Sequence, residues 1–95
     1  MTRKVILSPR FRREFKRFAK RDRERQHAIE KTIRLMEADP FAPFLETHKL
    51  SGTLIGSLAC SCGFDCRILF RIERDQDADA ELIILTGIGT HEDVY

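Results

Sequence analysis

Hydrophobic residues in the first forty positions recur at the spacing of a helix. Ser8 and Pro9 form a typical helix start, because serine caps the first turn and proline fits the first helical position. The apolar residues 5–7 before them predict a short strand. An apolar stripe then follows at positions i, i+4, i+7 and i+8 of the predicted helix, formed by Phe11, Phe15, Phe18 and Ala19.

A second helix is predicted after a charged break at residues 20–26. Asp22 is a possible cap, and Pro40 ends the pattern because the residue before a proline avoids helical geometry. Two helices with a short join predict an antiparallel hairpin. The apolar stripe of the second helix consists of Ala28, Ile29, Thr32, Ile33, Leu35 and Met36.

The C-terminal half changes to the alternating pattern of β-strands. A loop made rigid by two prolines is predicted at 40–52, followed by strands at 53–62, 66–73 and 81–89, a turn at 63–65 and a polar loop at 74–80. In the middle strand the apolar face carries Cys66, Ile68, Phe70 and Ile72, and the other face carries Asp65, Arg67, Leu69 and Arg71. We therefore expect Asp65 and Arg67 to point away from the helices, side by side.

These elements predict one α+β domain over residues 1–95, in the order β-α-α-β-β-β. An N-terminal strand and an antiparallel two-helix hairpin would pack on an antiparallel β-sheet, with the first strand added to it. No apolar run approaches the roughly 20 residues of a membrane span. The apolar part of the N-terminus is also shorter than the core of a secretion signal. We expect a cytoplasmic protein with no membrane contact.

Positive charge is concentrated at the N-terminal end of the chain. Residues 1–26 hold eleven Lys or Arg against three acidic residues, although the net charge of the whole chain is only +2. Such a block suits a polyanion or an acidic protein partner, although a solvated helix face would look the same. The exposed side of the first predicted helix would carry Arg12, Arg13, Lys16, Arg17 and Lys20.

The three cysteines are close together in the run CSCGFDC. This spacing is too cramped for a useful disulfide framework and fits the reduced thiols of a cytosolic protein. A zinc site is the alternative, but alternate residues of a strand do not converge on a tetrahedron as C-x2-C turns do. We expect Cys60, Cys62 and Cys66 to act as small buried hydrophobes, and no metal or other cofactor.

A set of polar residues in the C-terminal half has the chemistry of phosphodiester cleavage without a metal ion. One group would take the proton of a ribose 2′-hydroxyl, a second would protonate the leaving oxygen, and a guanidinium would stabilise the phosphorane. Histidine suits both proton transfers because its ordinary pKa, about 6.5, lies near the working pH. An aromatic ring could stack on a base. The residues in question are His48, Asp65, Arg67, His91 and Tyr95.

Two runs of sequence, LETHKLSGTLIGSLACSCGFDCRILFRI and IILTGIGTHEDVY, resemble the RelE/ParE superfamily of bacterial toxins. The similarity is greatest to the YafQ-like branch, whose members carry an H-x-L-x-G element, an aspartate at a strand start, and a terminal G-T-H motif followed by an aromatic residue. The resemblance extends over nearly the whole chain. It implies the RelE-like fold and the toxin of a type II toxin–antitoxin module, a ribosome-dependent mRNA endonuclease that an antitoxin silences.

The resemblance also implies roles for individual residues. His48 matches the histidine of H-x-L-x-G, Asp65 the aspartate, His91 the histidine of G-T-H, and Tyr95 the terminal aromatic residue. Arg67 matches an arginine that contacts the scissile phosphate in related toxins. His48 or Asp65 would accept the 2′-hydroxyl proton, and His91 would donate to the leaving group. The basic helix face, together with Lys49, would bind ribosomal RNA or mRNA, and an acidic antitoxin segment would also fit that face.

Two departures from the YafQ-like pattern keep other functions open. Ser61 replaces a second histidine before the aspartate, and Gly87 replaces an arginine four residues before the G-T-H histidine. One alternative is an inactive toxin that acts as a co-repressor with its antitoxin. Another is an inhibitor of DNA gyrase like the ParE-type relatives, which generally lack the histidine and aspartate set.

Overall fold

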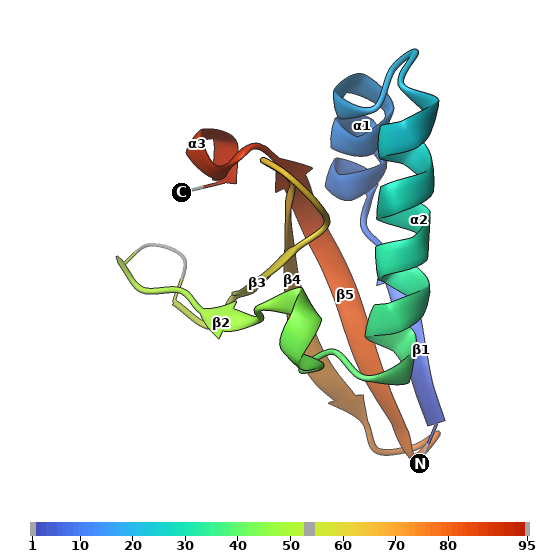
Figure 1. Cartoon of the computed structure of the whole chain (residues 1–95). Helices are drawn as coiled ribbons and strands as arrows, with labels where there is room; N and C mark the ends of the chain where they lie inside the picture. Colours follow the sequence, from blue (N-terminus) through green and yellow to red (C-terminus); the bar gives the residue numbers. More distant parts are fainter. Residues whose placement is uncertain (1, 53–54, 95) are drawn as a thin grey trace.

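Two helices cover one face of a five-stranded sheet (Figure 1). The computed structural model describes residues 2–52 and 55–94, so the predicted α+β class is confirmed for nearly the whole chain. None of the described helices is long and apolar enough to span a membrane. The elements in chain order are β1 (Thr2–Leu7), α1 (Pro9–Phe18), α2 (Arg23–Ala38), the 3-10 turn η1 (Pro43–Leu45), β2 (His48–Lys49), β3 (Leu58–Ser61), β4 (Arg67–Asp75), β5 (Ala80–Gly89) and α3 (His91–Val94).

Both predicted helix starts are confirmed by side-chain caps. The Ser8 hydroxyl oxygen accepts a hydrogen bond of 3.0 Å from the backbone N–H of Phe11. The Asp22 carboxylate accepts one of 2.9 Å from the N–H of Arg25. These contacts satisfy N–H groups that have no partner inside the helix. The turn between α1 and α2 is short, so the two helices form the expected hairpin (Figure 1).

The sheet is mixed, whereas an antiparallel sheet was predicted. The strand order is β1-β5-β4-β3-β2, and β1 runs parallel to β5, with Thr2 opposite Ala80 and Leu7 opposite Leu85. The other three pairings are antiparallel. Parallel neighbours need a long crossover connection, and here the helix hairpin forms part of the chain between β1 and β5. Local alternation along a strand contains no information about that direction.

The predicted strand at 53–62 was too long, and the loop at 40–52 contains an unforeseen strand. Residues 53 and 54 lie outside the described residues, and β3 begins only at Leu58. Gly56 has a φ of +92°, a conformation that breaks an extended strand. The loop holds η1 and the two-residue strand β2, which pairs with the start of β3. The polar loop is shorter than predicted, because β4 extends to Asp75 and β5 begins at Ala80.

The core lies between the helices and the sheet. The predicted alternation along β4 is confirmed for Ile68 and Phe70, which are fully buried against the helices. Leu69 on the opposite face is also buried, in a small second cluster with Ala59 and the partly buried Leu50. This second cluster makes the outer face of the sheet partly apolar. Buried side chains from the helices include Phe11, Ile29 and Met36.

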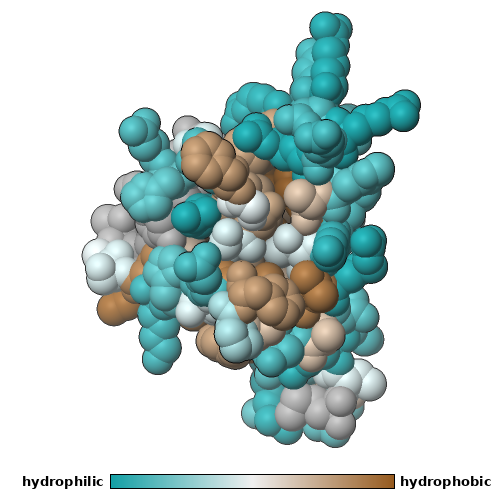
Figure 2. All heavy atoms as spheres, viewed as in Figure 1, coloured by the Kyte–Doolittle hydropathy of each residue, from teal (hydrophilic) through white to brown (hydrophobic). Residues whose placement is uncertain are grey.

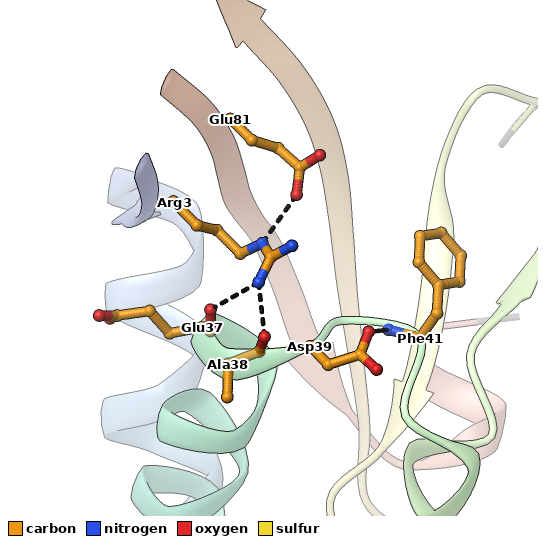
Figure 3. Close-up of polar contacts among 6 residues, drawn as sticks. All are labelled: Arg3, Glu37, Ala38, Asp39, Phe41 and Glu81. Atoms are coloured by element: carbon orange, nitrogen blue, oxygen red, sulfur yellow. Dashed lines mark hydrogen bonds and ion pairs between the residues drawn. The ribbon is translucent and has the colours of Figure 1, made fainter. Parts of the chain in front are cut away.

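Arg3 ties the first strand to the end of the second helix (Figure 3). Its Nε donates to a carboxylate oxygen of Glu81 on β5 at 2.8 Å. Its Nη1 donates to the backbone oxygens of Glu37 and Ala38, at the C-terminus of α2. A cation is favourable there because the last carbonyls of a helix have no partner within it. One basic residue of the N-terminal block therefore has a structural use.

We expect Ser8→Ala to lower the free energy of unfolding by about 1 kcal/mol, because the N–H of Phe11 loses its acceptor. Urea denaturation followed by circular dichroism measures this change. Ser51→Ala is a suitable control, because Ser51 is exposed in a loop. Equal stabilities of the two variants would show that the cap contributes nothing.

Candidate active site

Asp65 and His91 meet although they lie far apart in sequence. Asp65 precedes β4 in a left-handed conformation, with a φ of +49°. Its Oδ1 accepts a hydrogen bond of 3.2 Å from the backbone N–H of His91, the first residue of α3. Both residues are exposed. The carboxylate thereby fixes the start of the short C-terminal helix, and with it the position of the His91 side chain.

Arg67 lies next to this pair at the same end of the sheet. It is the first residue of β4, opposite Ser61 on β3 and Gly89 on β5. Gly89 is two residues before His91, so Asp65, Arg67 and His91 gather where β4 begins and β5 ends. The Arg67 side chain is half-buried, and its Nη1 donates to the backbone oxygen of Cys66 at 2.9 Å. As predicted, Arg67 lies on the face opposite Ile68, because alternate strand residues point to opposite faces.

His48 lies on the same face of the sheet but two strands away from Arg67. It is exposed on the edge strand β2, opposite Ala59, which in turn is opposite Leu69 on β4. Standard strand spacings then separate the Cα atoms of His48 and Arg67 by about 12 Å. In Figure 1, β2 and α3 both lie on the side of the sheet away from α1 and α2. Long side chains at these positions therefore face one shared surface.

The tautomer of His48 follows from its contact with the backbone. Its Nδ1 lies 3.0 Å from the backbone oxygen of Glu46, which a hydrogen bond donated by a protonated Nδ1 explains. In the neutral ring Nε2 is then the acceptor, which is the state that a general base requires.

Two predicted site residues are not placed beside these groups. Tyr95 lies outside the described residues. Lys49 is opposite Leu58, whose side chain belongs to the core between sheet and helices. Because neighbouring strand residues alternate, Lys49 points away from the face that carries His48. It is exposed, but it does not extend the surface formed by His48 and Arg67.

The five basic residues predicted at the first helix are exposed, and they line two depressions that share Lys16. Arg12 and Lys16 flank an apolar groove of about 340 Å³ that also contains Phe11 and Phe15. Figure 2 shows hydrophilic side chains projecting around the upper part of the helix hairpin. A shallow depression of about 530 Å³ is lined by Arg13, Lys16, Arg17 and Lys20.

The prediction of three reduced cysteines was wrong for two of them. Cys62 and Cys66 form a disulfide, with Cα atoms 5.1 Å apart. A turn was predicted at 63–65, but Gly63 and Asp65 adopt positive φ and make it tight enough to bring the two cysteines together. Glycine and aspartate between two cysteines are the signal that could have revealed this tight geometry. Asp65 thus lies inside the loop that the disulfide closes.

Cys60 is a free thiol buried between the sheet and α2. Its sulfur lies 3.7 Å from that of Met36. Burial raises the pKa of the Cys60 thiol to about 12, against a smaller opposing effect of the Arg67 charge. It therefore remains a thiol at neutral pH. Among residues 2–52 and 55–94, no three His, Cys, Asp or Glu side chains are grouped so that they could hold a metal ion.

We expect reduction of the disulfide to lower the free energy of unfolding by about 2 kcal/mol, from the chain entropy of so short a loop. Urea denaturation with and without dithiothreitol measures the difference. The Cys62→Ala/Cys66→Ala variant is the control, because its stability should not respond to dithiothreitol. A wild-type protein equally stable under both conditions would contradict the expectation.

Comparison with known proteins identifies one family. The model described as "Bacterial toxin of type II toxin-antitoxin system, YafQ" matches residues 3–95. None of the curated proteins is similar enough in sequence to count as a match.

Three solved structures illustrate that the fold is shared at low sequence identity. YafQ from E. coli strain BL21(DE3) has a TM-score of 0.77 at 14% identity, covering 99% of each chain. The YoeB/ParE toxin from Agrobacterium tumefaciens has a TM-score of 0.75 at 16% identity, covering 93% of this chain and 98% of that one. A chain of the E. coli DinJ-YafQ toxin-antitoxin complex has a TM-score of 0.72 at 13% identity, covering 100% of this chain and 99% of the matched one. At such identities these likenesses concern the fold.

Proposed function

Since the chain belongs to the YafQ family of bacterial toxins, which are components of type II toxin–antitoxin systems, we propose that it is an endoribonuclease that cleaves mRNA on the ribosome. The observation that carries the proposal is the gathering of Asp65, Arg67 and His91 at one end of the sheet, with His48 on the same face. These residues supply two imidazoles, a carboxylate and a guanidinium on one exposed surface.

The reaction begins with attack of the ribose 2′-oxygen on the neighbouring phosphorus. A base removes the 2′-hydroxyl proton as the new P–O bond forms, and an acid protonates the 5′-oxygen as its bond to phosphorus breaks. His91 is the acid. Arg67 stabilises the additional negative charge on the phosphorane oxygens, because a guanidinium donates in a fork that matches them. No electron transfer or metal-bound water is needed.

His48 is a better base than Asp65 in this geometry. One oxygen of Asp65 already accepts the N–H of His91, so this carboxylate is engaged in holding the start of α3. An imidazole with its Nε2 unprotonated is suited to the step. Asp65 then acts as a positioning residue, because it holds the start of α3 and therefore the proton donor.

RNA would also be held by the basic surface of α1 and by Lys49. Contacts between arginine or lysine and phosphates release counterions, so this part of the affinity is independent of sequence and falls with salt. Tyr95 is proposed to stack on a base near the cut. The binding residues proposed on α1 and in the turn after it are Arg12, Arg13, Lys16, Arg17 and Lys20, all of them exposed.

We assign a cognate antitoxin as the protein partner. YafQ of E. coli is found in a complex with DinJ, and its fold matches this chain over its full length. An acidic antitoxin segment that folds on binding would complement the basic helix surface. The site of action is the cytoplasm, where the ribosomes are.

One second function is favoured by a specific observation. Ser61 lies opposite Arg67, where the YafQ-like pattern has a histidine, and a serine hydroxyl cannot replace an imidazole as a general acid or base near neutral pH. A toxin that has lost its activity and serves as a co-repressor would show this departure. Expression without antitoxin discriminates between the two, because an inactive toxin would not arrest growth. A gyrase inhibitor would produce DNA breaks without cuts in mRNA.

Primer extension on mRNA, after induction of the toxin in a bacterial host, tests the proposed function itself. Cuts at fixed codon positions in translated messages, and their absence from untranslated RNA, are expected for a ribosome-dependent nuclease. Growth arrest without any such cuts would contradict it.

We expect His91→Ala to reduce the rate of mRNA cleavage by about 10²–10⁴-fold, the usual contribution of a general acid. Single-turnover cleavage on programmed ribosomes measures the rate. His27→Ala is the matched control, because it removes an exposed imidazole from α2, on the other side of the sheet. Cleavage by the His91 variant at the control's rate would remove His91 from the mechanism.

A further inference from the structure

Arg10 is the strongest candidate for a role that the proposed mechanism leaves out. On α1, Arg10, Glu14 and Arg17 succeed one another at i, i+4 and i+7, so they form a polar stripe beside the buried phenylalanines. This stripe lies against the C-terminal end of β5. It is distinct from the surface of Arg12 and Lys16, which lies on the other flank of the phenylalanines.

The position of Arg10 is fixed by a chain of contacts to β5. Glu14 Oε1 accepts a hydrogen bond of 3.0 Å from the backbone N–H of Ile88. Glu14 Oε2 accepts one of 3.1 Å from Arg10 Nε. The Glu14 side chain is only 20% exposed, whereas that of Arg10 is 57% exposed. Arg10 is therefore anchored at one nitrogen while its outer end faces solvent.

Gly87 allows Glu14 and this guanidinium to approach β5 closely. A Cβ added at Gly87 would lie 3.0 Å from Glu14 Oε1, 3.5 Å from Cδ1 of Leu69, the residue opposite it on β4, and 3.7 Å from Cζ of Arg10. The guanidinium thus lies over the face of the sheet that carries Leu69 and, two residues away, Arg67. Standard strand spacings put the Cα atoms of Gly87 and Arg67 about 8 Å apart. The guanidinium of Arg10, a residue of α1, therefore lies beside the proposed cleavage site.

A polar cleft continues this positive surface between α1, α2 and the end of β5. It has a volume of about 540 Å³, and its lining includes the arginines Arg10, Arg17 and Arg25 together with the carboxylate of Glu14. Arg25 is held in place, because its guanidinium lies 4.1 Å from the centre of the Phe18 ring and donates to the Phe18 backbone oxygen. Thr90, the neighbour of His91, also lines the cleft.

We propose that Arg10 binds a backbone phosphate of the RNA substrate next to the scissile one, and that the cleft behind it guides the strand away from the cleavage site. Within residues 2–52 and 55–94, no hydrogen bond uses the Nη groups of Arg10, and its side chain is 57% exposed, so both groups are available to a ligand. A planar guanidinium with two such donors matches a phosphate in charge and geometry. Arg10 thus adds a cation to this end of the sheet, beside Gly87 of β5.

The proposal rests on the proposed function. Its test therefore measures RNA binding, which does not depend on cleavage. Binding of a short single-stranded RNA with 2′-O-methyl riboses, which cannot be cleaved by 2′-hydroxyl attack, is measured by fluorescence anisotropy at several salt concentrations. For Arg10→Ala we expect binding about tenfold weaker at low salt. The slope of log K against log salt should shrink by about 0.7, the loss of one phosphate contact on a single strand.

Two further variants separate phosphate binding from a structural effect. Arg34→Ala is the matched control, because it also removes one exposed arginine from a helix and should leave affinity and slope unchanged. Glu14→Gln removes a negative charge while keeping an oxygen that can accept from Ile88, so RNA should bind at least as tightly. If Arg10 acted only by holding Glu14, then Glu14→Gln and Arg10→Ala would weaken binding alike.

The outcomes that overturn the proposal are distinct from failure of the proposed function. If the slope of log K against log salt were the same for Arg10→Ala and wild type, Arg10 would make no phosphate contact, even if wild type cleaves mRNA. If Arg10→Ala lost binding to a polyglutamate peptide but still bound RNA like wild type, the surface around Arg10 would instead be assigned to an acidic protein segment. A wild-type protein that cuts no mRNA but shows the expected slopes would disprove the nuclease and leave the phosphate site standing.

Discussion

The antiparallel register between β4 and β5 is the constraint on which the rest of this surface depends. Arg67 is opposite Gly89, and this pairing puts the start of β4 beside the end of β5. A slip of one residue would turn Arg67 toward the helices and expose Ile68 and Phe70, which are now fully buried. Each such side chain contributes about 1.5–3 kcal/mol by burial. Hydrophobic packing therefore decides where the polar site forms.

The local elements could be read from the sequence because their signals are local. Ser8 and Asp22 cap the helices where their side-chain chemistry predicted, and the alternation along β4 placed Arg67 on the correct face. The parallel pairing of β1 and the hydrogen bond between Asp65 and the backbone of His91 could not be predicted from local patterns, because both join residues distant in the chain. Asp65 and His91 had been grouped only by their chemistry and by the family resemblance. The disulfide was missed for the opposite reason: a turn was predicted, but its positive-φ geometry was not recognised.

The free edge of β5 explains an otherwise odd acidic residue in a basic helix. The pairing of β5 with β1 ends at Leu85. The backbone oxygen of Leu85 accepts a hydrogen bond from the N–H of Ser8, the residue that follows β1. Beyond it, the N–H of Ile88 faces no strand, and a buried donor without an acceptor is costly. Glu14 provides the acceptor. Because Glu14 also binds Arg10, the need to satisfy one strand edge brings a guanidinium to the face that carries Arg67.

The disulfide and the turn that carries Asp65 contribute differently to the site. Backbone hydrogen bonds from Cys62 N to the oxygen of Cys66, at 3.0 Å, and from Cys66 N to the oxygen of Gly63, at 3.3 Å, already define the turn. The disulfide adds a covalent link between residues that these bonds hold together. In a reducing cytoplasm the link would be lost, but the hydrogen bonds do not require it. We therefore expect the contact of Asp65 with His91 to depend on the backbone of the turn, and reduction to lower stability without removing these hydrogen bonds.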